Sequence, residues 1–366
     1  MAVPYLDLKQ QHAALASEIL ADVKSILESA WFVNGKFIAE LEKQFAAKSN
    51  STSAVAVASG TAACKLCYQA LGLKPGDEII TTPNTFFATC EAAWALGATT
   101  RFVDVDPDSF NMDPKALEDA IGPRTKIIVP VHLYGLPCDM DAIMDIAARN
   151  GLAVVEDACQ SHFATFNGKP VGSFGSAAAF SFYPSKNLGA CGDAGICTTS
   201  DPGVDRMLRV LRDHGQTGKY THEAFGDNGR MDEIQAAVLV RKMAHIDNWT
   251  RARQAAAARY IEQLSGIPGL RFQHVSEEKT HVYYMFVIRH PEREKIADQF
   301  DADRIGYAFR GVRPLHTQKV FAGSPGIEPL PVVELLMQEM LALPIFPEMT
   351  MEQVDEVCAS VRKALA

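Results

Sequence analysis

The stretch that decides the fold is AVVEDACQ, at residues 153–160. It begins as a short apolar run and ends near two adjacent acidic residues, Glu156 and Asp157. Five further apolar runs lie at residues 55–58, 78–82, 101–105, 126–131 and 177–182. Helical patterns fall between several of the runs, at 61–71, 86–97, 114–121 and 139–150. This alternation indicates an α/β fold with a largely parallel sheet that is covered by helices on both faces.

The rest of the chain predicts a second, smaller unit. Residues 232–264 read as one long helix, which a glycine- and proline-containing segment at 266–269 ends. An α+β pattern follows, with a strand at 282–289 and helices near 292–300, 331–341 and 350–364. The length of 366 residues corresponds to about two domains. We therefore predict an N-terminal arm and large α/β domain over residues 1–250, and a smaller C-terminal α+β domain over residues 251–366.

Composition and charge narrow the class of protein. Hydrophobic residues make up 48% of the chain and charged residues 22%, which is typical of a packed globular protein. The net charge of −9 argues against a general nucleic-acid binder, although a local cluster of donors can still hold a small anion. No apolar run approaches the ~20 residues of a membrane helix, and the first residues lack a secretory pattern. We expect a cytoplasmic enzyme without a nucleic-acid or membrane partner.

The eight cysteines of this long chain do not read as a disulfide framework. Cys64 and Cys67 form a CxxC pair, a spacing that also occurs in redox and zinc sites. No second pair and no nearby histidine in the sequence completes a metal site, and the pair falls in a predicted helix. We interpret both as structural thiols, which pack as small hydrophobic side chains, and we predict no metal.

A first candidate binding segment is Ser59-Gly60-Thr61, which follows the run at 55–58 and opens a helix. A helix N-terminus offers backbone N–H groups and a positive dipole to a phosphate. Taken alone, the segment is better explained as a helix cap, because serine and threonine are common there. The dinucleotide motif GxGxxG and the P-loop motif are both missing from the sequence.

The second candidate is Asp157, at the end of the apolar run that begins at Ala153. Strand alternation points Glu156 and Asp157 to opposite sides. A carboxylate at the end of a central parallel strand faces the crevice where ligands bind, and there it can hold a proton on a heterocyclic nitrogen. The alternative, an acid that is simply solvated at a strand end, stays open on these residues alone.

The most specific segment is FSFYPSKNLG, at residues 180–189. Lys186 follows an apolar strand and precedes a glycine-rich turn, a suitable place for a Schiff base, and Ser181 would reach a phosphate from the same turn. The alternative is a surface lysine on a loop. A further turn at 226–232 brings Asn228 and Arg230, an amide and a guanidinium suited to an anion.

Together these segments resemble the DegT/DnrJ family of sugar-nucleotide aminotransferases, which use pyridoxal 5′-phosphate (PLP). The resemblance runs nearly end to end, from LDL at 6–8 to LPIFP at 343–347, through SGTAA at 59–63, PGDEI at 75–79, PVHLYG at 130–135 and EDACQ at 156–160. It implies the fold type I architecture, which is that of aspartate aminotransferase. That architecture agrees with the layout predicted from the apolar runs.

The resemblance also implies a role for each candidate. Lys186 would bind the cofactor as a Schiff base and then shuttle a proton, and Asp157 would keep the pyridine nitrogen protonated. Gln160 would bond the ring oxygen, and Phe86 would stack on the ring. The phosphate would be held by Gly60, Thr61, Ser181 and, from a neighbouring subunit, Asn228. The last assignment implies a homodimer with shared active sites.

The resemblance is less detailed for the substrate. Lysine rather than histidine at position 186 favours transamination over dehydration. The following turn, LGACGDAG at 188–195, looks more like family members that aminate a 3-keto sugar than like those acting on 4-keto sugars. The expected substrate contacts are Tyr183, His316, Lys219 and Arg230. For His316, an ordinary structural histidine is an equal alternative.

The sequence therefore predicts a two-step transamination. L-glutamate, or glutamine, would convert the cofactor to pyridoxamine 5′-phosphate, which would then aminate a keto sugar linked to dTDP or UDP, at C3. The product would serve surface-polysaccharide or secondary-metabolite biosynthesis. Two alternatives stay open: amination of a keto-cyclitol of the inosose type, and a non-catalytic regulator that binds PLP.

Overall fold

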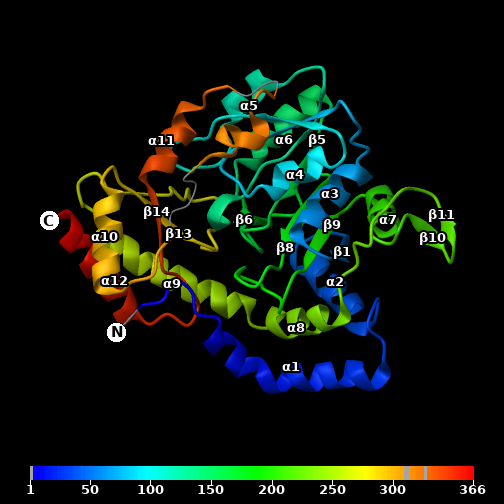
Figure 1. Ribbon diagram of the computed structural model, residues 1–366, viewed down its shortest axis with the longest axis horizontal. Coiled ribbons are helices and arrows are strands. Elements are labelled where there is room, and N and C mark those ends of the chain that lie inside the picture. The colour runs from blue at the N-terminus through cyan, green and yellow to red at the C-terminus, as the bar shows by residue number, and fades with distance from the viewer. Residues whose placement is uncertain (1–2, 309–312, 325–327) are drawn as a thin grey trace.

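The computed structural model describes residues 3–308, 313–324 and 328–366 and is built around a seven-stranded sheet (Figure 1). The strand order is β1-β9-β8-β5-β4-β2-β3. The bounds are β1 Ser53–Val57, β2 Glu78–Thr81, β3 Thr99–Phe102, β4 Thr125–Ile128, β5 Ala153–Asp157, β8 Ala177–Ser181 and β9 Gly195–Thr199. Neighbours from β3 to β8 pair in parallel, whereas β9 is antiparallel to both β8 and β1. The carboxyl ends of β1, β2, β4, β5 and β8 therefore meet at one edge of the sheet.

Helices cover both faces of this sheet, as the sequence predicts. Along β1 and β8, alternate residues enter one core with α2 (Lys36–Lys48) and α8 (Glu233–Met243), or the opposite core with α3 (Gly60–Ala70) and α7 (Pro202–Leu211). Near the other edge lie α4 (Ala88–Trp94), α5 (Pro114–Ala120) and α6 (Met140–Asn150). The alternation arises because successive side chains of a strand point to opposite faces.

A second, three-stranded antiparallel sheet joins β12 (Arg271–Phe272), β13 (Phe286–Arg289) and β14 (Met340–Leu343). Its helices are α9 (Ile246–Leu264), α10 (Arg293–Asp303), α11 (Pro331–Glu339) and α12 (Met351–Leu365). The N-terminal helix α1 (Lys9–Ser29) contacts α8. The hairpin of β10 (Gln216–Gly218) and β11 (Thr221–His222) projects at the end of the molecule opposite the two termini (Figure 1). A second short hairpin joins β6 (Thr165–Phe166) and β7 (Lys169–Pro170).

The structure corrects two sequence predictions. The glycine-rich turn continues into a strand, β9, because Gly195 lets the chain approach the Ser59 carbonyl oxygen, which a Cβ would meet at 2.4 Å. The single helix expected over 232–264 is two helices, α8 and α9, which meet at Ala244 and His245. Neither glycine nor proline marks this break. Within the described residues, no helix combines the length and the apolar character that crossing a membrane requires.

Candidate active site

A cavity of about 660 Å³ lies at the edge where the parallel strands end. It is bordered by the loops after β1, β2, β5 and β8 and by a segment that precedes β13. Eight of the residues singled out in the sequence line it: Gly60, Thr61, Phe86, Asp157, Gln160, Ser181, Tyr183 and Lys186. The cavity therefore gathers side chains that are up to 126 positions apart in the chain, from Gly60 to Lys186.

Asp157 is the last residue of β5, and two donors fix its carboxylate. Thr89 donates its hydroxyl to Oδ2 at 2.6 Å, and the backbone N–H of Cys159 donates to Oδ1 at 3.2 Å. The side chain is only 6% exposed and that remaining surface faces the cavity. A carboxylate held in this way is suited to a charge-assisted hydrogen bond with a protonated ring nitrogen.

Lys186 follows β8 in a tight turn, where its N–H donates to the carbonyl of Tyr183 at 2.8 Å. Its Nζ lies 4.3 Å from the centre of the Tyr284 ring. Neighbouring groups anchor the turn. Asn187 Nδ2 donates to the carbonyl of Val282 at 2.8 Å, and the buried Lys242 donates to the carbonyl of Gly189 at 2.7 Å. The lysine thus projects into the cavity from a fixed backbone.

The start of α3 has the features of a phosphate cradle. Ser59 caps the helix, since its hydroxyl accepts the N–H of Ala62 at 3.1 Å, so the helix-cap interpretation is confirmed. A Cβ on Gly60 would lie 2.6 Å from the Cβ of Ser181, so only glycine permits this approach. The first N–H groups of a helix have no partner within the helix, and here they lie beside the Ser181 hydroxyl.

Two further side chains complete the wall of the cavity. Gln160 Oε1 accepts the N–H of Tyr134 at 2.9 Å, which orients the amide. Phe86 is 73% exposed although it lines a cavity, an arrangement suited to stacking on a flat ring. A lysine, an oriented carboxylate, an exposed aromatic ring and a helix N-terminus fit PLP, a phosphorylated pyridine aldehyde, in residue type and position.

Four residues named from the sequence do not line the cavity. Lys219 lies in the β10–β11 hairpin with its Nζ 5.4 Å from the Tyr220 ring. The Arg230 guanidinium forms an ion pair with the Asp213 carboxylate. The backbones of Asn228 and Asp213 pair in an isolated antiparallel β-bridge. His316 is 6% exposed, and its Nε2 lies 3.0 Å from the Glu334 carboxylate. In the single chain, these four are separate from the residues around Lys186.

Sequence reasoning missed several lining residues. Thr89 lies one helical turn after Phe86, so the helical period could have found it. Asn84, Tyr284 and Arg313 also line the cavity. Tyr284 and Arg313 follow Lys186 by 98 and 127 residues, and no local pattern links them to it.

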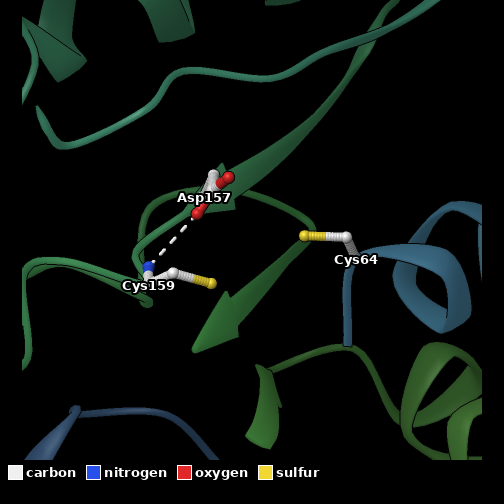
Figure 2. A group of neighbouring side chains, drawn as sticks. All are labelled: Cys64, Asp157 and Cys159. Carbon is white, nitrogen blue, oxygen red and sulfur yellow. Dashed lines mark hydrogen bonds between the residues drawn. The ribbon is translucent and has the colours of Figure 1, made fainter. Parts of the chain in front are cut away.

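The cavity wall also contains two thiols beside Asp157. Cys64 on α3, Cys159 and Asp157 have their ligand atoms within 4.8 Å of one another (Figure 2). A hydrogen bond with Cys159 lowers the pKa of the Cys64 thiol, but burial and the Asp157 charge outweigh it and raise that pKa to about 11. Cys67 faces elsewhere, with its Sγ 3.7 Å from the carbonyl oxygen of Ala178. The CxxC spacing therefore does not identify the thiols that lie together.

Comparisons with known proteins agree with this geometry. A transaminase of Streptomyces venezuelae that is named for dTDP-3-amino-3,4,6-trideoxy-alpha-D-glucose is 40% identical over 99% of this chain and 96% of its own. A UDP-N-acetyl-3-dehydro-alpha-D-glucosamine 3-aminotransferase of Acidithiobacillus ferrooxidans is 42% identical over 100% of this chain and 98% of its own.

The crystal structure of S. venezuelae DesV in complex with a ketimine intermediate superposes with a TM-score of 0.96 at 40% identity, covering 99% of this chain and 98% of that one. Residues 13–362 match the family described as DegT/DnrJ/EryC1/StrS aminotransferases. The fold predicted from the sequence is confirmed. The chain belongs to the DegT/DnrJ/EryC1/StrS aminotransferase family.

Proposed function

We propose that this enzyme uses PLP to transfer an amino group from L-glutamate to C3 of a keto sugar that is linked to a nucleoside diphosphate. The observation that carries the proposal is the meeting of Lys186, Asp157 and the Gly60–Ser181 contact on one cavity wall. Relatives at 40% and 42% identity, named for a dTDP-linked 3-amino sugar and a UDP-linked 3-dehydro sugar, support the substrate class.

PLP, when bound, supplies an aldehyde that takes up the amino group and a ring that accepts electrons. The residues of the chain hold and direct it. The N–H groups at the start of α3 and the Ser181 hydroxyl would hold its phosphate, and Phe86 would contact its ring. The Asp157 carboxylate would hold a proton at the pyridine nitrogen, and Thr89 keeps that carboxylate in place.

Lys186 has two tasks in this proposal. Its Nζ would hold the cofactor covalently at the aldehyde carbon. The same Nζ would move a proton between the α-carbon of a bound amino substrate and the cofactor side. The anchored turn around Asn187 and Gly189 keeps Nζ within reach of both atoms. Arg313, on the same cavity, offers a cation to the carboxylate of glutamate.

We also propose that the enzyme is a homodimer that shares its active sites. Asn228, Lys219 and Arg230 lie outside the cavity of their own chain, which is consistent with their serving the cavity of a second copy. Large apolar side chains are exposed beside them and on α1 and the loop after it: Leu20, Leu27, Trp31, Tyr220 and Phe225. These exposed apolar side chains are available for contact with a second subunit.

The test is a Lys186→Ala variant beside a Lys295→Ala control, since Lys295 is exposed on α10, away from the proposed contact surface. We expect Lys295→Ala to aminate a dTDP- or UDP-linked 3-keto sugar from glutamate at the wild-type rate, and Lys186→Ala to lose this activity by a factor of at least about 10⁴. Wild-type turnover by Lys186→Ala would refute the proposal. Faster turnover of an inosose than of either nucleotide-linked sugar would replace the substrate class with a keto-cyclitol.

A further inference from the structure

The group formed by Cys64, Cys159 and Asp157 has no part in the transamination derived above beyond Asp157 itself. The two thiols point toward one another from different elements, α3 and the loop after β5, with the carboxylate beside them (Figure 2). All three residues line the 660 Å³ cavity, so a small solute can reach them. The sequence predicts a structural role for Cys64, since no second cysteine pair or nearby histidine completes a metal site there; Asp157 and Cys159 lie more than 90 positions further along the chain.

We propose that Cys64, Cys159 and Asp157 form a binding site for a thiophilic divalent cation, Zn²⁺ or Cd²⁺, in the cofactor-free chain. Two sulfur ligands select soft or borderline cations over Mg²⁺ and Ca²⁺, and Zn²⁺ also accepts a carboxylate oxygen. Each thiol releases its proton to solvent as the metal–sulfur bond forms. The two thiolates and the carboxylate together carry more negative charge than the divalent cation carries positive charge.

The distances allow a tetrahedral site. With Zn–S bonds of about 2.3 Å, two ligating sulfurs lie about 3.8 Å apart. The three ligand atoms already lie within 4.8 Å of one another, so small side-chain rotations close the site. All three ligands line the cavity, which has room for a water molecule or a substrate group as the fourth ligand.

The surroundings hold the ligands in place. The Asp157 carboxylate accepts bonds from Thr89 and from the backbone of Cys159, contacts that orient it as outer partners orient the ligands of known metal sites. Cys64 is 2% exposed on α3, and Cys159 Sγ lies 3.6 Å from the carbonyl oxygen of Ala179.

In this proposal the cation and PLP compete for Asp157. This part of the inference rests on the proposed role of Asp157 toward the pyridine ring, whereas binding of the cation does not. A Zn²⁺ ion bound to this carboxylate neutralises the negative charge that would otherwise favour a proton on the ring nitrogen. The site therefore makes loading of the cofactor sensitive to thiophilic metals.

The experiment uses the full-length chain, freed of cofactor with hydroxylamine and of metal with a chelator under reducing conditions. Cd²⁺ is added and the ultraviolet charge-transfer absorbance of the cadmium–thiolate bond is recorded. Isothermal titration with Zn²⁺ gives affinity and stoichiometry. The variants are Cys64→Ser, Cys159→Ser and, as a matched control, Cys191→Ser, which removes an exposed thiol that does not line the cavity.

We expect one cadmium per chain with two thiolates bound, and no such absorbance with Ca²⁺. Cys64→Ser and Cys159→Ser should weaken Zn²⁺ binding by at least about 100-fold, since loss of an outer partner alone costs about 10–100-fold. Cys191→Ser should bind as the wild type does. No absorbance with the wild type, or undiminished binding by both cavity variants, would overturn the site.

The competition is read in the same cuvette by adding PLP, which has its own absorbance. Loss of the cadmium–thiolate band as PLP binds supports exclusion. Persistence of both bands overturns the competition, although the metal site stands. If PLP does not bind the metal-free wild type, the proposed function fails independently of the cadmium result. PLP binding by the serine variants shows that they are folded.

Discussion

Two acidic side chains that are neighbours in the sequence have opposite surroundings in this molecule. Glu156 is completely buried, and its carboxylate accepts bonds from His132 and from the N–H groups of Gly172, Phe174 and Gly175. The next residue, Asp157, accepts two bonds and faces a cavity. Strand alternation creates this difference, because it turns one acid into the core and the other toward the crevice.

The comparison separates a structural carboxylate from a functional one. An acid whose oxygens are saturated by internal donors stabilises the fold, and its loss leaves those donors unpaired. An acid that keeps an accessible edge can bind something else. Substitutions at the two positions should therefore affect different measurements.

The largest expected effect is that of Asp157→Asn on activity. Asparagine retains an acceptor for the Thr89 hydroxyl but has no negative charge for the ring nitrogen. We expect kcat/KM for the glutamate half-reaction to fall about 10³-fold, the size of effect seen when one preorganised electrostatic contact is removed. The thermal midpoint should stay close to that of the wild type. A normal rate would show that Asp157 does not act on the cofactor.

Glu156→Gln should lower the stability of the fold and leave binding of the cofactor unchanged. The amide replaces a buried charge that faces four donors, so we expect the free energy of unfolding to fall by about 3 kcal/mol in urea titrations. PLP affinity, measured on the folded fraction, should be retained. A variant as stable as the wild type that fails to bind PLP would exchange the roles of the two acids.

The same acid predicts a pH dependence. Burial raises the pKa of Glu156, but the bonds from His132, Gly172 and Gly175 outweigh it and lower that pKa below its ordinary value. The stability it contributes is present above its unfolded pKa, about 4.3, and is lost as the pH falls through the lowered folded pKa. Urea titrations below about pH 4.5 should show a steeper loss for the wild type than for Glu156→Gln. Parallel curves would contradict this assignment.

A smaller effect is expected at the phosphate cradle. Gly60→Ala places a methyl group 2.6 Å from the Cβ of Ser181, so the start of α3 must shift. We expect PLP affinity to fall about tenfold, within the roughly 1–3 kcal/mol that overpacking costs. Gly122→Ala is the matched control, because its added Cβ would meet no atom within 4 Å. Equal affinity for the two variants would place the phosphate elsewhere.

The smallest effect concerns the proposed contact from a second subunit. Lys219 is exposed in the β10–β11 hairpin, so removing its charge should cost about 1 kcal/mol and raise KM for the nucleotide-linked sugar about fivefold at low salt. The rate of the glutamate half-reaction should not change. A change in that half-reaction instead of in KM would argue against a role in binding the sugar nucleotide.

The cavity residues could largely be predicted from the sequence because they follow strands. The ends of β1, β5 and β8 bring Gly60, Asp157 and Lys186 to one edge. β5 and β8 are parallel neighbours, and β1 has the same direction because β9 is antiparallel to both β1 and β8. The resemblance to a family then supplied their roles. Tyr284 and Arg313 could not be found in this way, since contact across 98 or 127 residues depends on how two sheets pack.

Dependence on tertiary packing also explains why the sequence did not predict the proximity of Cys64 to Cys159 or the break between α8 and α9. Cys64 and Cys67 are three positions apart in the sequence, but α3 directs the two thiols to different neighbours, Cys159 and the Ala178 carbonyl. The break between α8 and α9 contains no glycine or proline from which it could be predicted. Tertiary packing decides such features, and local patterns do not report it.

The most direct test of the account is to locate the covalent bond to the cofactor. The enzyme is loaded with PLP, reduced with borohydride, digested and analysed by mass spectrometry. We predict a single modified peptide that carries the reduced pyridoxyl group on Lys186. Modification of another lysine, or of none, would contradict the central claim that Lys186 and Asp157 form a PLP site.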